Sequence, residues 1–429
     1  MTYTFKLLIL IFIVSSIISC NYSKDNVTNG SSKTVKETPI KAPLLYDVYI
    51  PTDSNISNGI IVILDPHSKP QLIMDSLHTY ADNNHMALIG IKDVENGVRD
   101  YISIIDRDLT HFISTSKTSR NKIYMIGFSG AARMAEYFAY SHKINGLIMC
   151  GAGMNRKNQL PFPTVLIAGI KDFNFLEQYY DLNDKLSLNK NLISFVFDGP
   201  HQWPPVSYIS VGINFLIHRG KGGDDNLSSH YENQSEKYFA NNNYYYAVKS
   251  MEIAYKFKNY GSDKDILKKF ETLKQNKKVK NYYRRTDLFL EEELNRYKDL
   301  TRNIDVQKLK WWKNQINYIN SRSNKKDPIS ASSYARTKAY IGLVTFSKIN
   351  LSLSGKENAE SLDKYISIYE LLEPESPYLH FFKAVLLYRI GNELQAKDEM
   401  NIAKSKDFDD DKMLEQYFDS NFINSLNNL

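Results

Sequence analysis

Cysteine is scarce in this chain, and the motifs of several common protein classes are missing. Only two of the 429 residues are cysteine. No C-x-x-C or H-E-x-x-H spacing occurs, so the sequence predicts no metal site. No glycine-rich phosphate loop appears either. We therefore expect neither a metal nor another cofactor.

Long apolar runs are also scarce. One run of thirteen apolar or small residues, 7–19, follows Lys6. It is too short to span a bilayer but suits a secretory signal. It ends in Ile-Ile-Ser-Cys, which resembles a bacterial lipobox. In that interpretation residues 1–19 are removed and Cys20 becomes the lipid-modified first residue. A signal anchor with a chance cysteine is the alternative.

The residues after Cys20 indicate a tether. Residues 21–42 are rich in Asn, Ser, Thr and Lys and have few apolar positions, so we expect a flexible linker over residues 20–42. No later run is long enough to cross a bilayer. The sequence therefore predicts a protein of the bacterial cell envelope, periplasmic or surface-facing, held to the membrane by lipid alone.

The second cysteine and the charge each exclude a feature. Cys150 ends the apolar run 146–150 and is expected to be a buried strand residue. With Cys20 acylated, no disulfide can form within the chain.

The formal net charge is +6, partly from lysines in the last two hundred residues. We interpret this excess as solvated surface and predict no nucleic-acid partner.

Apolar strand-like runs alternate with helical patterns between residues 43 and 220. This alternation predicts an α/β domain with a mostly parallel, doubly wound sheet covered by helices on both faces. Ligands of such sheets bind at the carboxyl ends of the strands. The predicted strands are residues 45–50, 59–64, 86–91, 122–126, 144–149, 164–170 and 192–197.

A serine stands where one of these strands turns into a helix. The sequence Gly127-Phe128-Ser129-Gly130-Ala131 follows an apolar strand and precedes an amphipathic stretch. Such a turn strains the backbone at the serine and requires small residues two before and two after it, as Gly127 and Ala131 are. The helix also directs free N–H groups toward the hydroxyl. An ordinary strand-to-helix turn capped by serine is the alternative.

An acid and a histidine follow two later strands. Asp172 comes after the strand at 164–170, and His201 comes after the strand at 192–197. The order Ser, Asp, His, each just past a strand, resembles the triad of the α/β-hydrolases. The likeness covers residues 43–218 and is strongest to the compact esterase and depolymerase branch. It implies that Ser129, Asp172 and His201 are catalytic.

The resemblance also implies a role for each residue. His201 would accept the proton of Ser129, and Asp172 would hold the imidazole in the right tautomer. Asp198 is a rival acid, although it is close in sequence to His201. The family often has Gly-Gly-His-x-Trp-Pro here, whereas this chain has Pro200 in place of the second glycine.

Two backbone donors are expected to stabilise the oxyanion. One is the N–H of Gly130. The other is the N–H of Ser68 or Lys69, and the sequence does not choose between them. Relatives often have Asp-Pro-His-Gly in this loop, and Ser68 replaces that glycine. If the position needs a positive φ, serine adds a steric cost.

The chain changes character after about residue 228. Glycine becomes rarer, and the apolar period becomes helical. Ala384, Ala396, Met400 and Ala403 lie at tetratricopeptide-like spacings. We therefore predict an all-α domain of degenerate helical repeats over residues 228–429, which offers a surface for a protein partner.

Two classes of function remain open. The first is an envelope-anchored serine hydrolase that cleaves small or polymeric carboxylic esters, with peptide cleavage as its nearest rival. The short segment between residues 154 and 162 leaves no room for a helical lid, so the site is expected to be open to bulky substrates. The second is a binding lipoprotein whose hydrolase domain is degenerate and whose repeats recruit a partner.

Overall fold

The computed structural model describes residues 46–116, 122–155, 160–183, 189–218, 223–258, 261–355 and 361–426. The predicted signal, Cys20 and the tether lie outside the described residues. The chain divides into two compact units, Met1–Asp287 and Leu288–Leu429. Each unit is described by itself below.

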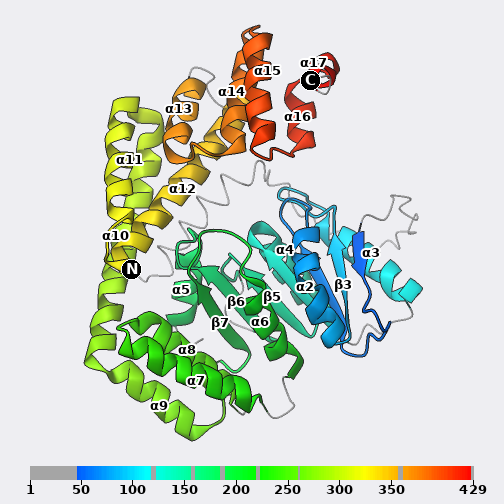
Figure 1. The fold of residues 1–429 in the computed structure, drawn as a ribbon, viewed down its shortest axis with the longest axis vertical. Coiled ribbons are helices and arrows are strands. Elements are labelled where there is room, and N and C mark those ends of the chain that lie inside the picture. Colours follow the sequence, from blue (N-terminus) through cyan, green and yellow to red (C-terminus); the bar gives the residue numbers. More distant parts are fainter. Residues whose placement is uncertain are drawn as a thin grey trace, which may run out of the picture. The chain divides into compact units, whose positions relative to one another are not determined.

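The first unit is built on a seven-stranded sheet (Figure 1). The strand order is β1-β3-β2-β4-β5-β6-β7, and every neighbouring pair is parallel except β1 with β3. This confirms the predicted mostly parallel sheet. The strands are β1 (Tyr46–Tyr49), β2 (Gly59–Leu64), β3 (Met86–Ile91), β4 (Ile123–Phe128), β5 (Gly146–Cys150), β6 (Thr164–Gly169) and β7 (Leu192–Phe197).

Burial on both faces of the sheet explains why the strands have continuous apolar sequences. Every residue of β2 through β7 is buried, as expected for parallel strands covered on both faces. Helices α3 (Tyr101–Ser116) and α4 (Ser129–Ser141) share one core with the sheet, and α2 (Gln71–Asn83) and α6 (Val206–His218) share the core of the other face. Cys150 is fully buried, as predicted.

The first unit also contains α5 (Phe175–Asn183), α7 (Asp225–Ala240), α8 (Tyr244–Phe257) and α9 (Lys264–Gln275). Helix α8 has two apolar faces: Ile253 and Phe257 join the core of the sheet, while Met251 and Ala254 pack with α9. The predicted boundary between residues 220 and 228 therefore lies inside this compact unit. Periodicity identifies a helix but does not tell which domain the helix packs against.

Small residues bring α7 and α8 close together. Ala247 and Ala254 are fully buried, and their carbonyls accept hydrogen bonds from Ser235 Oγ at 2.7 Å and Ser228 Oγ at 2.9 Å. The small residues of α8 thus allow the two helices to pack closely.

The second unit is helical throughout its described residues, which confirms the all-α prediction for this part of the chain. In the hairpin of α14 and α15, Ala384, Ala396, Met400 and Ala403 are fully buried, and Gly391 turns the chain with φ 81°. Assignment to tetratricopeptide repeats stays a prediction. Its helices are the end of α10 (Lys277–Val306), α11 (Leu309–Ser323), α12 (Pro328–Leu353), α13 (Leu362–Leu372), α14 (Pro377–Arg389), α15 (Glu393–Ser405), α16 (Asp411–Tyr417) and α17 (Ser420–Leu426).

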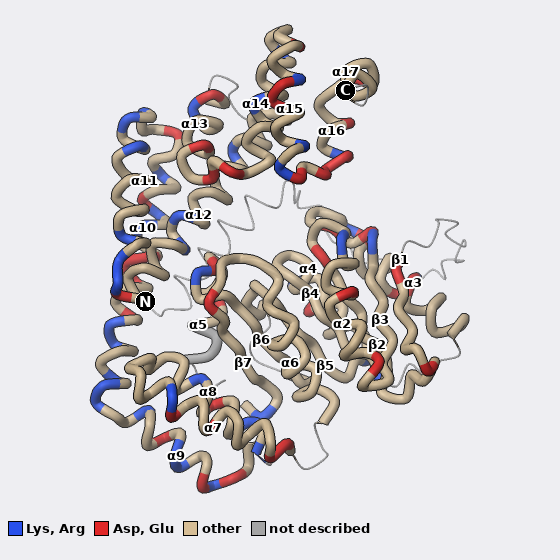
Figure 2. The backbone as a smooth tube through the Cα atoms, in the orientation of Figure 1, with Lys and Arg blue, Asp and Glu red and all other residues tan. Residues whose placement is uncertain are grey.

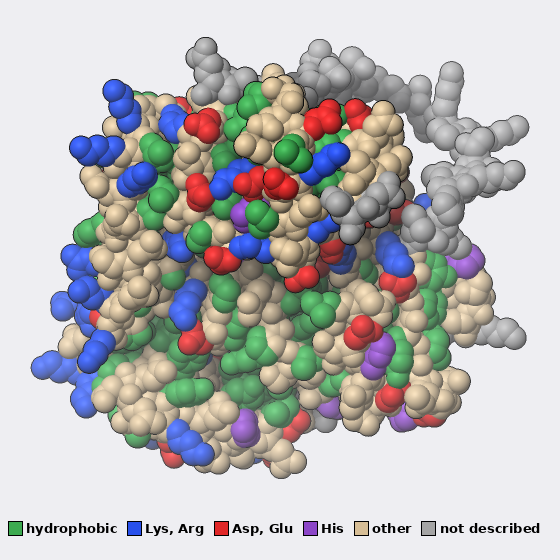
Figure 3. Space-filling view, turned by 45° about the horizontal axis from the view of Figure 1, so that its top comes forward, with side chains coloured by type: hydrophobic (Ala, Val, Ile, Leu, Met, Phe, Trp, Pro, Cys, Tyr) green, Lys and Arg blue, Asp and Glu red, His purple; other side chains and the backbone are tan. Residues whose placement is uncertain are grey.

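Charged residues lie mainly outside the strands. Figure 2 shows Lys, Arg, Asp and Glu mainly on helices and loops, while the strands from β2 to β7 carry none. The space-filling view of Figure 3 shows both basic and acidic side chains at the surface. Among the described residues, no helix is both long and apolar enough to cross a membrane.

Candidate active site

Ser129 lies at the junction of β4 and α4. Its φ of 52° is the strained backbone that the motif predicts. Close packing explains the small neighbours, because a Cβ at Gly127 would approach the Cα of Ala132 to 2.6 Å. Ala131 is fully buried, whereas Ser129 itself is half-buried. The strained turn therefore holds the hydroxyl at the carboxyl end of the sheet without enclosing it.

The acid and the histidine predicted from the sequence meet Ser129. His201 Nε2 lies 2.9 Å from Ser129 Oγ, and His201 Nδ1 lies 2.9 Å from Asp172 Oδ1. The Asp172 side chain is 1% exposed, and that of His201 is 18% exposed. The three residues follow β4, β6 and β7, whose carboxyl ends lie at the same edge of the sheet. Together they form one continuous chain of hydrogen bonds.

The rival acid is engaged elsewhere. Asp198 Oδ1 pairs with Lys171 Nζ at 2.8 Å, and the Asp198 side chain is 72% exposed. Pro200 precedes His201 without drawing the imidazole away from Ser129. Of the two candidate acids, only Asp172 therefore contacts His201.

Asp172 is held by a residue that the sequence analysis did not single out. The backbone N–H of Asn174 donates to Asp172 Oδ1 at 2.8 Å, and the Asn174 side-chain amide donates to the carbonyl of Gly151 at 2.8 Å. Gly151 has φ 62°, and a Cβ there would lie 3.1 Å from His201 Cε1. Asn174 thus ties the acid to the loop after β5, where only a glycine fits comfortably against the histidine.

Aromatic rings position the histidine. The ring centroids of Phe128 and Phe173 lie 4.7 and 4.3 Å from that of His201. Trp203 stacks on Phe128 at 5.3 Å, and its Nε1–H donates to Asp65 Oδ2 at 2.8 Å. The Trp203–Asp65 hydrogen bond joins the histidine loop to the loop after β2.

The loop after β2 differs from the prediction in one respect. Ser68 has φ 58°, so this position does adopt the left-handed backbone that normally favours glycine. However, the Ser68 N–H donates to Asp65 O at 3.1 Å, and the Lys69 N–H donates to Asp65 Oδ1 at 3.3 Å. Both predicted candidates for the second oxyanion donor are therefore already bonded within the loop. An oxyanion at either N–H would therefore compete with Asp65 or share the donor with it.

Gly130, the other predicted donor, has an unexpected neighbour. A Cβ at Gly130 would lie 1.9 Å from Asn96 Oδ1, so the Asn96 side chain lies directly against this glycine. The backbone N–H of Asn96 donates to Pro66 O at 3.0 Å, which joins the β3–α3 loop to the loop after β2. No sequence motif marks Asn96, because its position depends on how two distant loops pack.

Two buried glutamates organise the loop after β5. Glu177 Oε2 accepts hydrogen bonds from Arg133 at 2.7 Å and from the Gly153 N–H at 3.0 Å. Glu136 accepts from the Asn155 N–H through both oxygens. Arg133 and Glu136 lie on α4, so the helix that begins at Ser129 also fixes this loop. In the described part of the chain, no group of three His, Cys, Asp or Glu residues could hold a metal ion.

Comparisons with known proteins find only distant likenesses, all of them to solved structures. No protein-family model matches the chain, and no curated protein does. Among solved structures, the esterase PE8 is 12% identical, with a TM-score of 0.34 over 40% of this chain and 98% of its own. The fluorophosphonate-binding serine hydrolase F of Staphylococcus aureus is 13% identical, with a TM-score of 0.33 over 41% and 95%. An alpha-beta serine hydrolase homologue of Coxiella burnetii is 15% identical, with a TM-score of 0.32 over 44% and 100%.

These similarities are too low to assign an activity. The class that the sheet itself defines is an α/β fold with a mostly parallel sheet, and a serine, a histidine and an aspartate lie at the carboxyl ends of its strands.

Proposed function

We propose that this protein is a serine hydrolase that cleaves carboxylic esters. The proposal rests on one observation: the hydrogen-bond chain from Ser129 through His201 to Asp172, with both contacts at 2.9 Å. A serine hydroxyl is a weak nucleophile unless a base lies within hydrogen-bond reach. His201 meets that condition, and Asp172 orients it.

The aspartate selects the reactive tautomer of the histidine. The carboxylate of Asp172 accepts the Nδ1–H of His201, which leaves the lone pair of Nε2 facing the Ser129 hydroxyl. When Oγ attacks the ester carbonyl, the hydroxyl proton passes to Nε2. Imidazolium then donates that proton to the departing alcohol, and an acyl-serine remains.

Water completes the cycle. His201 removes a proton from a water molecule, whose oxygen attacks the acyl carbonyl, and the same proton returns to Ser129 Oγ as the carboxylic acid leaves. The N–H of Gly130 would stabilise both oxyanions, since it follows the nucleophile at the start of α4. Asn96 lies beside this donor and would touch the bound ester.

Ester hydrolysis tests the proposal directly. The chain from residue 21, which keeps every described residue, is assayed against p-nitrophenyl butyrate and a set of acylated sugars. Replacement of Ser129 by alanine should lower kcat by several orders of magnitude. Ser141→Ala, at the exposed end of the same helix, serves as the matched control. Equal turnover by the Ser129→Ala variant would refute the assignment.

A second function is favoured by the bonded N–H groups of Ser68 and Lys69. Both N–H groups are bonded to Asp65, so neither is a free second donor for an oxyanion. A binding lipoprotein with a degenerate hydrolase domain does not require such a donor. Under this alternative, no ester or peptide is cleaved, and the helical part of the chain recruits a protein partner.

Peptide cleavage by the same triad is the rival to ester cleavage. Assaying a peptide library beside the esters distinguishes the two activities.

Anchoring to the bacterial envelope through lipid on Cys20 forms part of the proposal. Phase partition in a cloud-point detergent measures it: the full chain expressed in bacteria should enter the detergent phase, and Cys20→Ala should remain in the aqueous phase. Detergent partition of the variant would instead indicate a signal anchor.

A further inference from the structure

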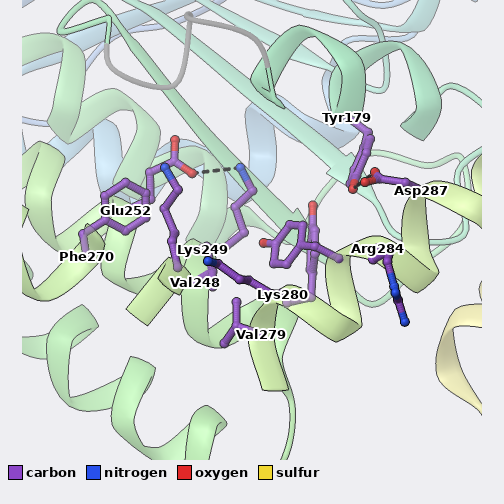
Figure 4. Close-up of a pocket in the computed structure, with 12 residues that line it drawn as sticks. Tyr179, Val248, Lys249, Glu252, Phe270, Val279, Lys280, Arg284 and Asp287 are labelled. Carbon is purple, nitrogen blue, oxygen red and sulfur yellow. Dashed lines mark hydrogen bonds and ion pairs between the residues drawn. The ribbon is translucent and has the colours of Figure 1, made fainter. Parts of the chain in front are cut away.

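A cavity lies in the first unit, away from the triad. Its volume is about 380 Å³, and it is lined by side chains of α8, α9 and α10 together with Tyr179 of α5 (Figure 4). Neither Ser129, Asp172 nor His201 belongs to its walls. A cavity of this size is within the range of sites for small organic molecules.

The cavity contains a buried ammonium group with donor capacity to spare. Lys249 is 9% exposed, and its Nζ donates to Glu252 Oε2 at 2.9 Å and to Ser194 Oγ at 3.0 Å. A lysine ammonium has three N–H donors. The third has no acceptor among the described residues. A ligand atom that accepts a hydrogen bond would satisfy it.

The walls carry more positive than negative charge. Four cations, Lys249, Lys274, Lys280 and Arg284, line it together with two carboxylates. Of these cations, Lys274 also pairs with Glu271 Oε1 at 3.3 Å, outside the lining. Both carboxylates already have partners, because Glu252 binds Lys249, and Asp287 accepts from Tyr179 Oη at 2.7 Å. The side chains of Lys280 and Arg284 have no hydrogen bond or ion pair with a described residue. The uncompensated charge therefore favours an anion.

The remaining walls are apolar and aromatic. Tyr245 and Tyr283 lie with ring centroids 6.1 Å apart, and Phe270 and Val279 are each 2% exposed. In Figure 4 the guanidinium of Arg284 points away from the Lys249–Glu252 pair. Arg284 thus lies at the rim, whereas Lys249 is buried. Such a surface suits a ligand with a flat apolar body and one negative group.

We propose that this cavity binds a small organic carboxylate with an aryl or alkyl body. The carboxylate meets Lys249 and the basic residues of α10, and the apolar body packs between Tyr245, Tyr283 and Phe270. The site does not depend on the triad, so it stands or falls separately from the proposed ester hydrolysis.

The probe is 4-phenylbutyrate, with 4-phenylbutanol as its neutral counterpart. Binding to the chain from residue 21 is measured by isothermal titration calorimetry. We expect phenylbutyrate to bind about tenfold more tightly than phenylbutanol, because the alcohol lacks the charge that the lysines meet. Equal affinities for the two compounds, or no binding of phenylbutyrate, would overturn the proposal.

Charge reversal on one helix locates the binding site. The double variant Lys280→Glu/Arg284→Glu should weaken phenylbutyrate binding at least about tenfold. The matched control Lys277→Glu/Lys278→Glu makes the same change of charge on exposed residues of α10 outside the cavity. The control should bind like the wild-type chain, and thermal unfolding monitors the fold of both variants. Equal weakening in both pairs, or in neither, would contradict the assignment.

Discussion

His201 Nε2 lies 2.9 Å from Ser129 Oγ, although the two residues are 72 positions apart in the sequence. The contact exists because β4 and β7 run parallel in one sheet, so their following loops meet at the same edge. A further hydrogen bond of 2.9 Å extends the chain to Asp172. The account of catalysis depends on these two contacts.

The identity of the acid can be tested by comparing two aspartates. Asp172→Asn should lower kcat by about 10³- to 10⁴-fold with little change in KM, because the amide stabilises the wrong imidazole tautomer. Asp198→Asn should leave kcat nearly unchanged, since Asp198 is exposed and pairs with Lys171. Steady-state kinetics on p-nitrophenyl butyrate measures both. A larger loss in Asp198→Asn would reverse the assignment.

The contact between Gly130 and Asn96 predicts an epistatic pair. Gly130→Ala would place a Cβ 1.9 Å from Asn96 Oδ1, so one of the two residues must shift, which would disturb the N–H that we propose as an oxyanion donor. We expect kcat/KM to fall at least about tenfold in Gly130→Ala. Removing the obstacle in the double variant Gly130→Ala/Asn96→Ala should restore part of that loss. Additive losses in the double variant would show that Asn96 does not determine the effect.

The hydrogen bond from Trp203 to Asp65 predicts a loss of stability. Trp203→Phe keeps an aromatic ring against Phe128 but removes the Nε1–H that donates to the buried Asp65 carboxylate. The free energy of unfolding should fall by about 1–3 kcal/mol, since a charged acceptor loses its donor. Urea unfolding measures the change, with Trp311→Phe on α11 as the control for loss of an indole. An unchanged unfolding midpoint in Trp203→Phe would contradict this role.

Lys256 makes the stability depend on pH. Burial lowers the pKa of its ammonium from 10.5 to about 8, and its Nζ donates to Asn189 O at 2.7 Å. Between these two values the unfolded chain binds more protons than the folded chain, so raising the pH favours folding. We compare the free energy of unfolding of the wild-type chain with that of Lys256→Met. The difference between the two should shift by about 2 kcal/mol in favour of the wild-type chain as the pH rises from 8 to 10.

Urea titrations at four pH values measure that difference. Lys268→Met is the control, because Lys268 is exposed on α9. Its difference from the wild-type chain should stay constant over the same interval. If the difference in free energy of unfolding between the wild-type chain and Lys256→Met also stays constant, burial does not lower the pKa of Lys256.

The sequence predicted the parts of the site that depend on local pattern. Ser129 could be found because an apolar strand, small residues and a helix follow one another along the chain, and Asp172 and His201 because each follows a strand. The strained backbone of Ser129, with its φ of 52°, followed from the same motif, whereas a positive φ at Ser68 was considered only as a condition. These features are encoded within a few residues.

The parts that were missed depend on packing between distant segments. Asn174 and Asn96 act through loops that meet only in the folded sheet. The bonds from Ser68 and Lys69 to Asp65 depend on the exact course of one loop, which residue types do not reveal. Likewise, helical periodicity predicted α8 but not its packing against the sheet, so the expected domain boundary fell too early.

The most direct test of the account is covalent labelling of the chain by a fluorophosphonate, followed by mass spectrometry of the modified peptide. We expect one molecule of probe to attach to Ser129. The Ser129→Ala variant, once its thermal unfolding has shown that it is folded, should not be labelled. Absence of labelling in the folded wild-type chain, or labelling that persists in the variant, would contradict it.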